Sequence, residues 1–220
     1  MKLVENKRKI ISAVLALTSL SVMVLQLASC GGSSSKTTSA TTTTNQSALG
    51  SQSSTTTIIA TATTVATPAN VTVTSADGIV SISVPSGWNL SDTALYSGSV
   101  IGVANDANSE YVIITEPAKT DYGANSTVSD YMNVIQSVFG AVLTNPVWGQ
   151  SSNVTIGGCT GISAQLTGTR ISDGSNMVYY VNALASKSYY YNVCGYTTST
   201  MASSNQAQLE TIIKSFKETN

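Results

Sequence analysis

The sequence predicts an α+β domain in which an antiparallel sheet is flanked by helices. Apolar and polar residues alternate over residues 80–84, as in a half-buried strand. Over residues 127–142 the apolar spacing changes to that of a helix. From residue 160 onward, strand-like segments joined by short turns precede a closing amphipathic segment. Strands, a helix, an antiparallel meander and a last helix together indicate an α+β sandwich with helices on the faces of one sheet.

The first predicted strand, residues 80–84, ends in a turn. Pro85 lacks the N–H that a strand ladder needs, and Gly87 permits a backbone turn that a side chain would obstruct. We therefore expect Trp88 to fold back over the edge of the core, beneath the closing helix.

A hairpin is predicted from strands at residues 100–104 and 111–115. Asp106, Asn108 and Glu110 could offer oxygens to Ca²⁺ at its turn, but the central glycine and bidentate glutamate of a calcium loop are missing. We expect a polar turn and no metal site there.

The middle helix is predicted to begin at a near capping box, Thr127-x-x-Asp130, and Gly140 is expected to fray its end. Five apolar residues at helical spacing form its buried stripe: Val128, Tyr131, Ile135, Val138 and Val142.

Three strands are then expected, at residues 160–172, 176–185 and 188–196, with turns at 172–175 and 186–187.

A closing helix follows the third strand. Ser203 is expected to cap its start, and Lys214 and Lys217 suit the negative end of its dipole. Its apolar stripe consists of Leu209, Ile212, Ile213 and Phe216.

The N-terminus has the pattern of an export signal. A basic segment, residues 2–9, precedes an uncharged apolar run over 10–28. The tetrapeptide LASC, residues 27–30, resembles the lipobox of bacterial lipoproteins, in which the cysteine receives a diacylglyceryl group and the signal is cut before it. This predicts that Cys30 is a membrane anchor; a plain signal peptide or a permanent spanning helix is the weaker alternative.

Behind Cys30 lies a low-complexity tract. Over residues 33–67, 21 of 35 residues are Ser or Thr and Lys36 is the only charge, so the tract buries too little apolar surface to fold. The predicted organisation is a signal peptide at 1–29, a lipidated cysteine and disordered tether at 30–68, and one domain at 69–220. The predicted location is the extracytoplasmic face of a bacterial cell membrane.

Composition excludes several classes of function. Without residues 1–29, six basic residues face ten acidic ones, and this acidic balance argues against nucleic acid as a partner. The chain has no histidine, which removes Ser-His-Asp and Cys-His catalysis and the common zinc sites. Asp121 and Asp130 flank the middle helix as turn and cap residues, not as an acid/base pair. We expect no enzyme, no cofactor and no metal.

Tyrosine is enriched in the last two strands. Consecutive strand residues point to opposite faces, so Tyr189 and Tyr191 share one face and Tyr190 takes the other. Tyr179, Tyr180 and Tyr190 are the candidate binding surface, since tyrosine offers a large contact area and a hydroxyl. Cross-strand packing beneath the helices is the favoured interpretation of these rings, and a binding surface is the alternative.

Two further cysteines, Cys159 and Cys194, invite a disulfide in an exported protein. With the turns expected above, Cys194 lies opposite Tyr179, and Tyr179 opposite Gly168. Cys159 would then lie about 30 Å away along its strand, whereas a disulfide needs Cα atoms within about 7 Å. We expect two separate, buried thiols.

Three segments carry a resemblance to a known family: GIVSISVPSGWN near the start of the domain, NVTIGGCTGISAQL in the meander, and LETIIKSF at the end. Over residues 75–217 they resemble the PsbP-like fold of the extrinsic PsbP proteins of photosystem II and of LpqN-type bacterial lipoproteins. The resemblance implies an α/β/α sandwich and a binding or accessory protein without an active site. Metal sites of some members rely partly on histidine, so none is carried over.

The favoured hypothesis is a non-enzymatic cell-surface lipoprotein, held to the membrane by its lipid anchor, whose domain binds a protein partner or a cell-envelope component. The alternative is a small-ligand carrier that delivers lipid or solute to a membrane machine. A flat exposed aromatic patch would favour the first hypothesis, and a pocket lined by tyrosine and apolar side chains the second.

Overall fold

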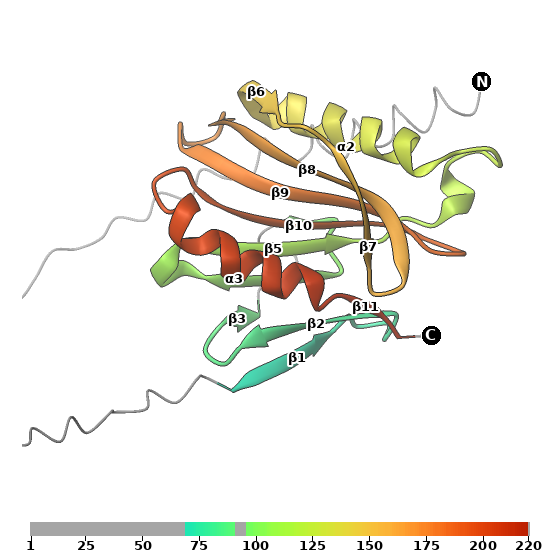
Figure 1. Cartoon of the computed structure of the whole chain (residues 1–220), viewed down its shortest axis with the longest axis horizontal. Helices are drawn as coiled ribbons and strands as arrows, with labels where there is room; N and C mark the ends of the chain where they lie inside the picture. The colour runs from blue at the N-terminus through green and yellow to red at the C-terminus, as the bar shows by residue number, and fades with distance from the viewer. Residues whose placement is uncertain (1–68, 91–95, 220) are drawn as a thin grey trace, which may run out of the picture. The chain divides into compact units, whose positions relative to one another are not determined.

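The structure, a computed structural model, describes residues 69–90 and 96–219 (Figure 1). The signal peptide, Cys30 and the tether predicted over residues 1–68 lie outside these residues. Among the described residues, no helix has the length and apolar character needed to span a membrane.

A large antiparallel sheet forms the centre of the domain. Its strands lie in the order β3-β4-β5-β10-β9-β8-β6, and β7 pairs with the other half of β8. The strands are β3 (Asn89–Leu90), β4 (Ile101–Asn105), β5 (Glu110–Thr115), β6 (Leu143–Trp148), β7 (Ser152–Ile156), β8 (Cys159–Arg170), β9 (Asn176–Ala185) and β10 (Tyr190–Thr198).

A second, smaller sheet joins the two ends of the described domain. It consists of β1 (Asn70–Thr74), β2 (Val80–Pro85) and β11 (Lys217–Glu218), in the order β1-β2-β11. The sequence predicted β2 alone, because β11 is two residues long and β1 is largely exposed.

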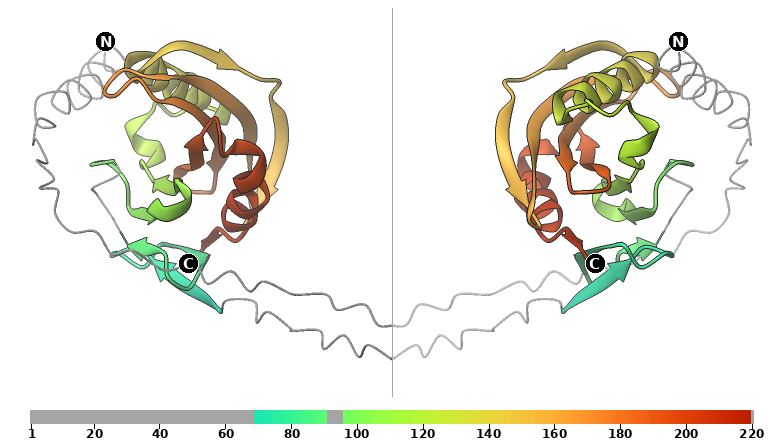
Figure 2. Two further views of the ribbon diagram at one scale, coloured as in Figure 1. Left: turned by 90° about the vertical axis from the view of Figure 1, so that its left-hand side faces the viewer. Right: turned by 90° about the vertical axis from the view of Figure 1, so that its right-hand side faces the viewer.

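Two helices cover opposite faces of the large sheet (Figure 2). Helix α2 (Val128–Val142) packs against β6, β8, β9 and β10. Helix α3 (Ala202–Lys214) packs against β5, β9 and β10 on the other face, together with β2. Two 3₁₀ turns, η2 (Asp106–Asn108) and η3 (Lys119–Asp121), complete the elements. The predicted α+β class, an antiparallel sheet flanked by helices, is confirmed.

The tyrosines of β9 and β10 alternate between the two cores, as predicted. Tyr180 and Tyr191 belong to the core beneath α3, whereas Tyr179, Tyr190 and Tyr196 belong to the core beneath α2. The strand period of two therefore places successive aromatic rings on opposite sides of the sheet.

The predicted register of the meander was wrong by two residues at each turn. Cys194 lies opposite Val181, and Val181 opposite Ala164. The first turn closes with Gly174 N donating to Arg170 O at 2.9 Å. In the second turn, Ser186 N donates to Tyr189 O at 3.0 Å, so the loop is longer than predicted.

Of the predicted helix ends, the start of α2 is confirmed, whereas the end of α2 and the start of α3 were wrong. The capping box of Thr127 and Asp130 at the start of α2 is confirmed. Gly140 does not fray α2, which continues to Val142. At α3 the expected cap was wrong: the N-cap is Met201, without a side-chain hydrogen bond, and Ser203 lies inside the helix.

Trp88 folds back as expected after the turn at Pro85. Gly87 has φ +93°, a conformation that favours glycine. Trp88 is 9% exposed and belongs to the core that also contains Ile213 and Phe216. The turn thus places the indole of Trp88 in the core beneath α3.

Replacing Trp88 with alanine should lower the free energy of unfolding by about 3–5 kcal/mol, because the side chain fills the core. Leu90→Ala is the matched control: Leu90 lies two residues further on, is 65% exposed, and should change stability by no more than about 0.5 kcal/mol. Chemical denaturation measures both, and equal midpoints for the two variants would contradict the burial of Trp88.

Two glycines should respond in opposite directions to alanine. A Cβ on Gly161 would lie 2.0 Å from Ala183 O and 2.8 Å from Leu184 Cα, both backbone atoms that cannot swing away. A Cβ on Gly140, inside α2, would meet nothing within 4 Å. We expect Gly161→Ala to destabilise the fold by about 1–3 kcal/mol and Gly140→Ala to stabilise it by roughly 0.5–1 kcal/mol. Thermal denaturation of both variants checks the signs.

Candidate functional site

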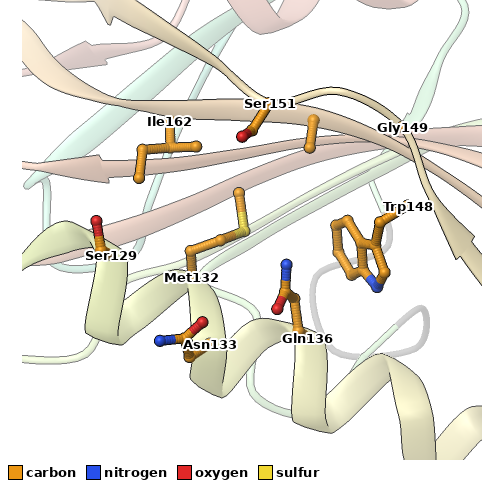
Figure 3. A pocket seen from close by; sticks show the side chains of 9 residues that line it. Ser129, Met132, Asn133, Gln136, Trp148, Gly149, Ser151 and Ile162 are labelled. Atoms are coloured by element: carbon orange, nitrogen blue, oxygen red, sulfur yellow. The ribbon is translucent and has the colours of Figure 1, made fainter.

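A hollow of about 210 Å³ opens between α2, the segment from β6 to β7, and β8 (Figure 3). It is lined by Ser129, Met132, Asn133, Gln136, Trp148, Gly149, Ser151, Ile162 and Ala164. We call it the Trp148 hollow.

Helix α2 presents a polar stripe to this hollow. Ser129, Asn133 and Gln136 recur at helical spacing and are exposed, whereas the adjacent Met132 is buried at 5% exposure. In Figure 3, Ser129, Met132 and Gln136 rise from the helix toward β8 and Trp148, and Asn133 lies in front of the helix below them. The hollow therefore has amides and hydroxyls on one wall and the Met132 side chain at its base.

Trp148 reaches the hollow because β6 contains an irregularity. The register against β8 shifts between Thr144 and Val147, Asn145 adopts φ +50°, and Pro146 follows it. In a regular strand, Leu143 and Trp148 would point to opposite faces. With the bulge, both pack on the core beneath α2.

The indole of Trp148 is half-buried and held from one side. Its ring packs edge-on against Phe139 of α2, with ring centroids 5.9 Å apart and planes at 73°. The neighbouring Val147 points away and is 63% exposed. Trp148 is therefore an aromatic side chain fixed in place at a surface.

The lining of the Trp148 hollow is electrically neutral. None of the described residues that line it is charged or is a cysteine. Its hydroxyls, on Ser129 and Ser151, have no titratable base beside them in that lining. Over residues 69–90 and 96–219, no group of three His, Cys, Asp or Glu side chains is arranged so that it could hold a metal ion. The arrangement offers shape, hydrogen bonds and apolar contact.

The three tyrosines proposed for a binding surface are buried. Tyr179, Tyr180 and Tyr190 are 6%, 8% and 1% exposed. Tyr190 stacks on Tyr131 with ring centroids 5.1 Å apart, and its hydroxyl donates to Ser126 O at 2.6 Å. Burial raises the pKa of Tyr179 to about 12. The structure gives these residues the packing role that the sequence analysis favoured.

The two cysteines are separate, buried thiols, as expected. Cys159 lies in the core beneath α3 and Cys194 in the core beneath α2, on opposite faces of the sheet. Burial raises the pKa of both thiols, so neither favours the reactive thiolate form.

The β4–β5 turn is closed by its own hydrogen bonds. Asn105 Nδ2 donates to Glu110 Oε2 at 2.9 Å, and Asn205 Nδ2 of α3 donates to Asn108 O at 2.7 Å. Glu110 is 1% exposed, and burial raises the pKa of its carboxyl. This carboxylate supports the turn from inside the fold.

Sequence reasoning missed a group of three carboxyls where the small sheet meets the large one. Burial, a hydrogen bond with Asp77 and the charges of Asp77 and Glu218 raise the pKa of Glu116 to about 8. Oε2 of Glu116 is buried without an N–H or hydroxyl donor. A proton shared between the carboxyls of Glu116 and Asp77 is the expectation tested below. Glu218 accepts a hydrogen bond from Tyr191 at 2.7 Å. No sequence motif indicates this group, because Asp77, Glu116 and Glu218 are far apart along the chain.

No protein-family model and no curated protein matches the sequence. Among solved structures, the chain is similar to cyanobacterial PsbP (CyanoP) from Synechocystis sp. PCC 6803, with 12% identity, coverage of 70% of this chain and 95% of that one, and a TM-score of 0.48. It is also similar to LpqN, involved in cell envelope biogenesis of Mycobacterium tuberculosis, with 16% identity, coverage of 69% and 91%, and a TM-score of 0.44. A third similar structure is PA94 of Pseudomonas aeruginosa, a protein of unknown function described as a putative regulator, with 9% identity, coverage of 66% and 94%, and a TM-score of 0.42. PsbP and LpqN, which the sequence motifs resemble, are thus both among the similar structures.

The Glu116 carboxyl should make stability depend on pH. Its folded pKa, about 8, lies above the value of about 4.3 for an unfolded chain. Its contribution to stability is therefore fully present below the unfolded pKa and is lost as pH rises through the folded pKa. Glu116→Gln keeps a hydrogen-bond donor for Asp77 but cannot ionise, so its stability relative to wild type should rise between about pH 5 and about pH 9.

Denaturation at several pH values measures this effect. Asp106→Asn, which removes an exposed carboxylate from the 106–108 turn, is the control. If the difference between Glu116→Gln and wild type stays constant with pH, the shared proton assigned to Glu116 and Asp77 is wrong.

Proposed function

We propose that this protein is a non-enzymatic lipoprotein of the bacterial cell envelope, anchored through Cys30 on the extracytoplasmic face, whose domain binds a protein partner at the Trp148 hollow. The basic segment, the apolar run and the lipobox-like LASC sequence support the location. The Trp148 hollow, with its neutral lining, supports the binding role.

The observation that carries the proposal is the half-buried Trp148 beside a hollow of about 210 Å³. Pockets for small molecules typically measure about 300–1,000 Å³. A smaller recess accommodates a single side chain of a partner. Tryptophan and methionine are enriched in protein interfaces, and tryptophan is frequent among the residues that dominate binding energy. Trp148 and Met132 therefore suit a docking surface.

The same dimensions disfavour the carrier hypothesis for this hollow. A lipid tail needs a continuous apolar enclosure, whereas exposed polar side chains, Asn133 and Gln136 among them, form one wall here. Those amides fit the polar rim that surrounds the apolar centre of a protein interface.

Trp148→Ala should reduce capture of the partner more than about tenfold, the effect expected when a residue of roughly 2 kcal/mol is removed from an interface. The full-length protein, with a photo-reactive amino acid at Gln136, is cross-linked in cells, and the adduct is quantified. Leu90→Ala, at the opposite edge of the sheet, is the control. Equal adduct in both variants, with unchanged stability, would exclude Trp148 from the interface.

Cys30→Ala should release the protein from the membrane, because the acylated thiol is the proposed anchor. Membranes washed with high salt are assayed for the wild type and for the variant, alongside Ser29→Ala, which keeps a small residue before the cysteine. Retention of Cys30→Ala after removal of its signal would contradict the lipid anchor.

A further inference from the structure

A second concavity, the α3 trough, lies on the face of the sheet opposite the Trp148 hollow. Its volume is about 590 Å³, within the range of about 300–1,000 Å³ for ligand sites. Strands β8 and β9 form its floor, α3 forms one wall and β7 the other. In Figure 1, α3 runs along the sheet and β7 passes beside its C-terminal half.

The floor presents neutral hydrogen-bonding side chains: Ser163, Gln165, Tyr180 and Asn182. Asn182 is 5% exposed and is fixed in place by Nδ2, which donates to Val193 O at 3.1 Å and to Tyr180 O at 3.4 Å. Its Oδ1 remains as an acceptor. Gln165 is exposed, and its amide lies beside the Tyr180 hydroxyl. The floor therefore combines a fixed amide with an accessible one.

The charges of the trough neutralise each other. Glu210 Oε1 accepts from Gln206 Nε2 at 2.8 Å, and Glu210 Oε2 accepts from Lys214 Nζ at 3.0 Å. Among the described residues that line the trough, Glu210 and Lys214 are the charged ones. An anionic ligand would have to separate Lys214 from its partner, so the lining favours an uncharged ligand.

The apolar part of the trough is divided into small areas. Val154 and Ile156 line it from β7, and Ile213 from α3, with the polar floor between them. A lipid chain would bury that polar floor without hydrogen bonds, which is costly. A ligand that alternates hydroxyl groups with C–H surface would satisfy both kinds of lining.

A peptide added as a strand does not suit this floor. The registered pairs of β8 with β7 and β9 cover residues 159–163 on one side and 160–169 on the other. Beyond residue 163, Gly149 N donates to Gln165 O at 2.8 Å. Most of the backbone of the floor is thus engaged in the sheet, and strand addition needs a free edge. Recognition must come from side chains.

We propose that the α3 trough binds a neutral saccharide chain. Sugar hydroxyls, like those of serine, both donate and accept hydrogen bonds and so match the amides of Gln165, Asn182 and Gln206. This site is independent of the Trp148 hollow, from which it is separated by the sheet.

The test uses the full-length protein in a detergent without sugar head groups. Isothermal titration calorimetry measures binding of neutral oligomers of glucose, of mannose and of N-acetylglucosamine, and of a serine- and asparagine-rich peptide. We expect at least one oligosaccharide to bind, and Gln165→Ala and Gln206→Ala each to weaken it by roughly tenfold, the loss for about one well-made hydrogen bond. Gln208→Ala, on the same helix but outside the lining, is the matched control.

Three results would overturn the proposal: no binding of any oligosaccharide, binding that both trough variants leave unchanged, or binding of the peptide alone. Trp148→Ala should leave saccharide affinity unaltered. Loss of partner cross-linking in that variant tests the Trp148 hollow separately, so failure of one site is distinguishable from failure of the other.

Discussion

The register of β9 between β8 and β10 decides which helix each large side chain of these three strands faces. Tyr179 stands between Leu166 and Tyr196 and faces α2. Its neighbour Tyr180 stands between Gln165 and Gly195 and faces α3. Because side chains alternate, a slip of one residue would exchange the contents of the two cores. Buried rings on both faces oppose such a slip.

A glycine in β10 sets how closely α3 approaches the large sheet. A Cβ on Gly195 would lie 3.0 Å from Ile213 Cδ1 and 3.4 Å from Leu209 Cβ. The bare backbone there lets α3 settle on β10, while β8 stays open beside it as the floor of the α3 trough. On the opposite face, the bulge in β6 turns Trp148 toward α2. Both concavities thus arise from local departures from regular packing.

The elements with strong periodicity could be predicted from sequence, and the others could not. The alternation of β2 reports burial of one face. The predicted stripe of α2 was right for Tyr131 and Ile135, but Met132 and Phe139 complete the buried face, and the three valines of the predicted stripe are only half-buried. Strands β6 and β7 escaped prediction because they are edge strands with mostly exposed side chains, and Pro146 interrupts β6. The meander register depended on turn lengths that hydrogen bonds of Ser186 and Gly174 decide. Two features of the sequence could have drawn attention to Trp148. It is one of only two tryptophans in the sequence, and it closely follows the Asn145-Pro146 step.

Strand β8 serves both concavities. Ile162 lines the Trp148 hollow, Ser163 and Gln165 line the α3 trough, and Ala164 belongs to the lining of both. This apolar and polar alternation matches an apolar anchor on one face and a hydroxyl-rich ligand on the other. Ladder pairs with β7 and β9 hold the backbone of β8 from both sides, so its geometry is set before either site is filled. Under the two proposals, occupancy of one face leaves the other available, so the proposed protein partner and the proposed saccharide would bind the same domain at the same time.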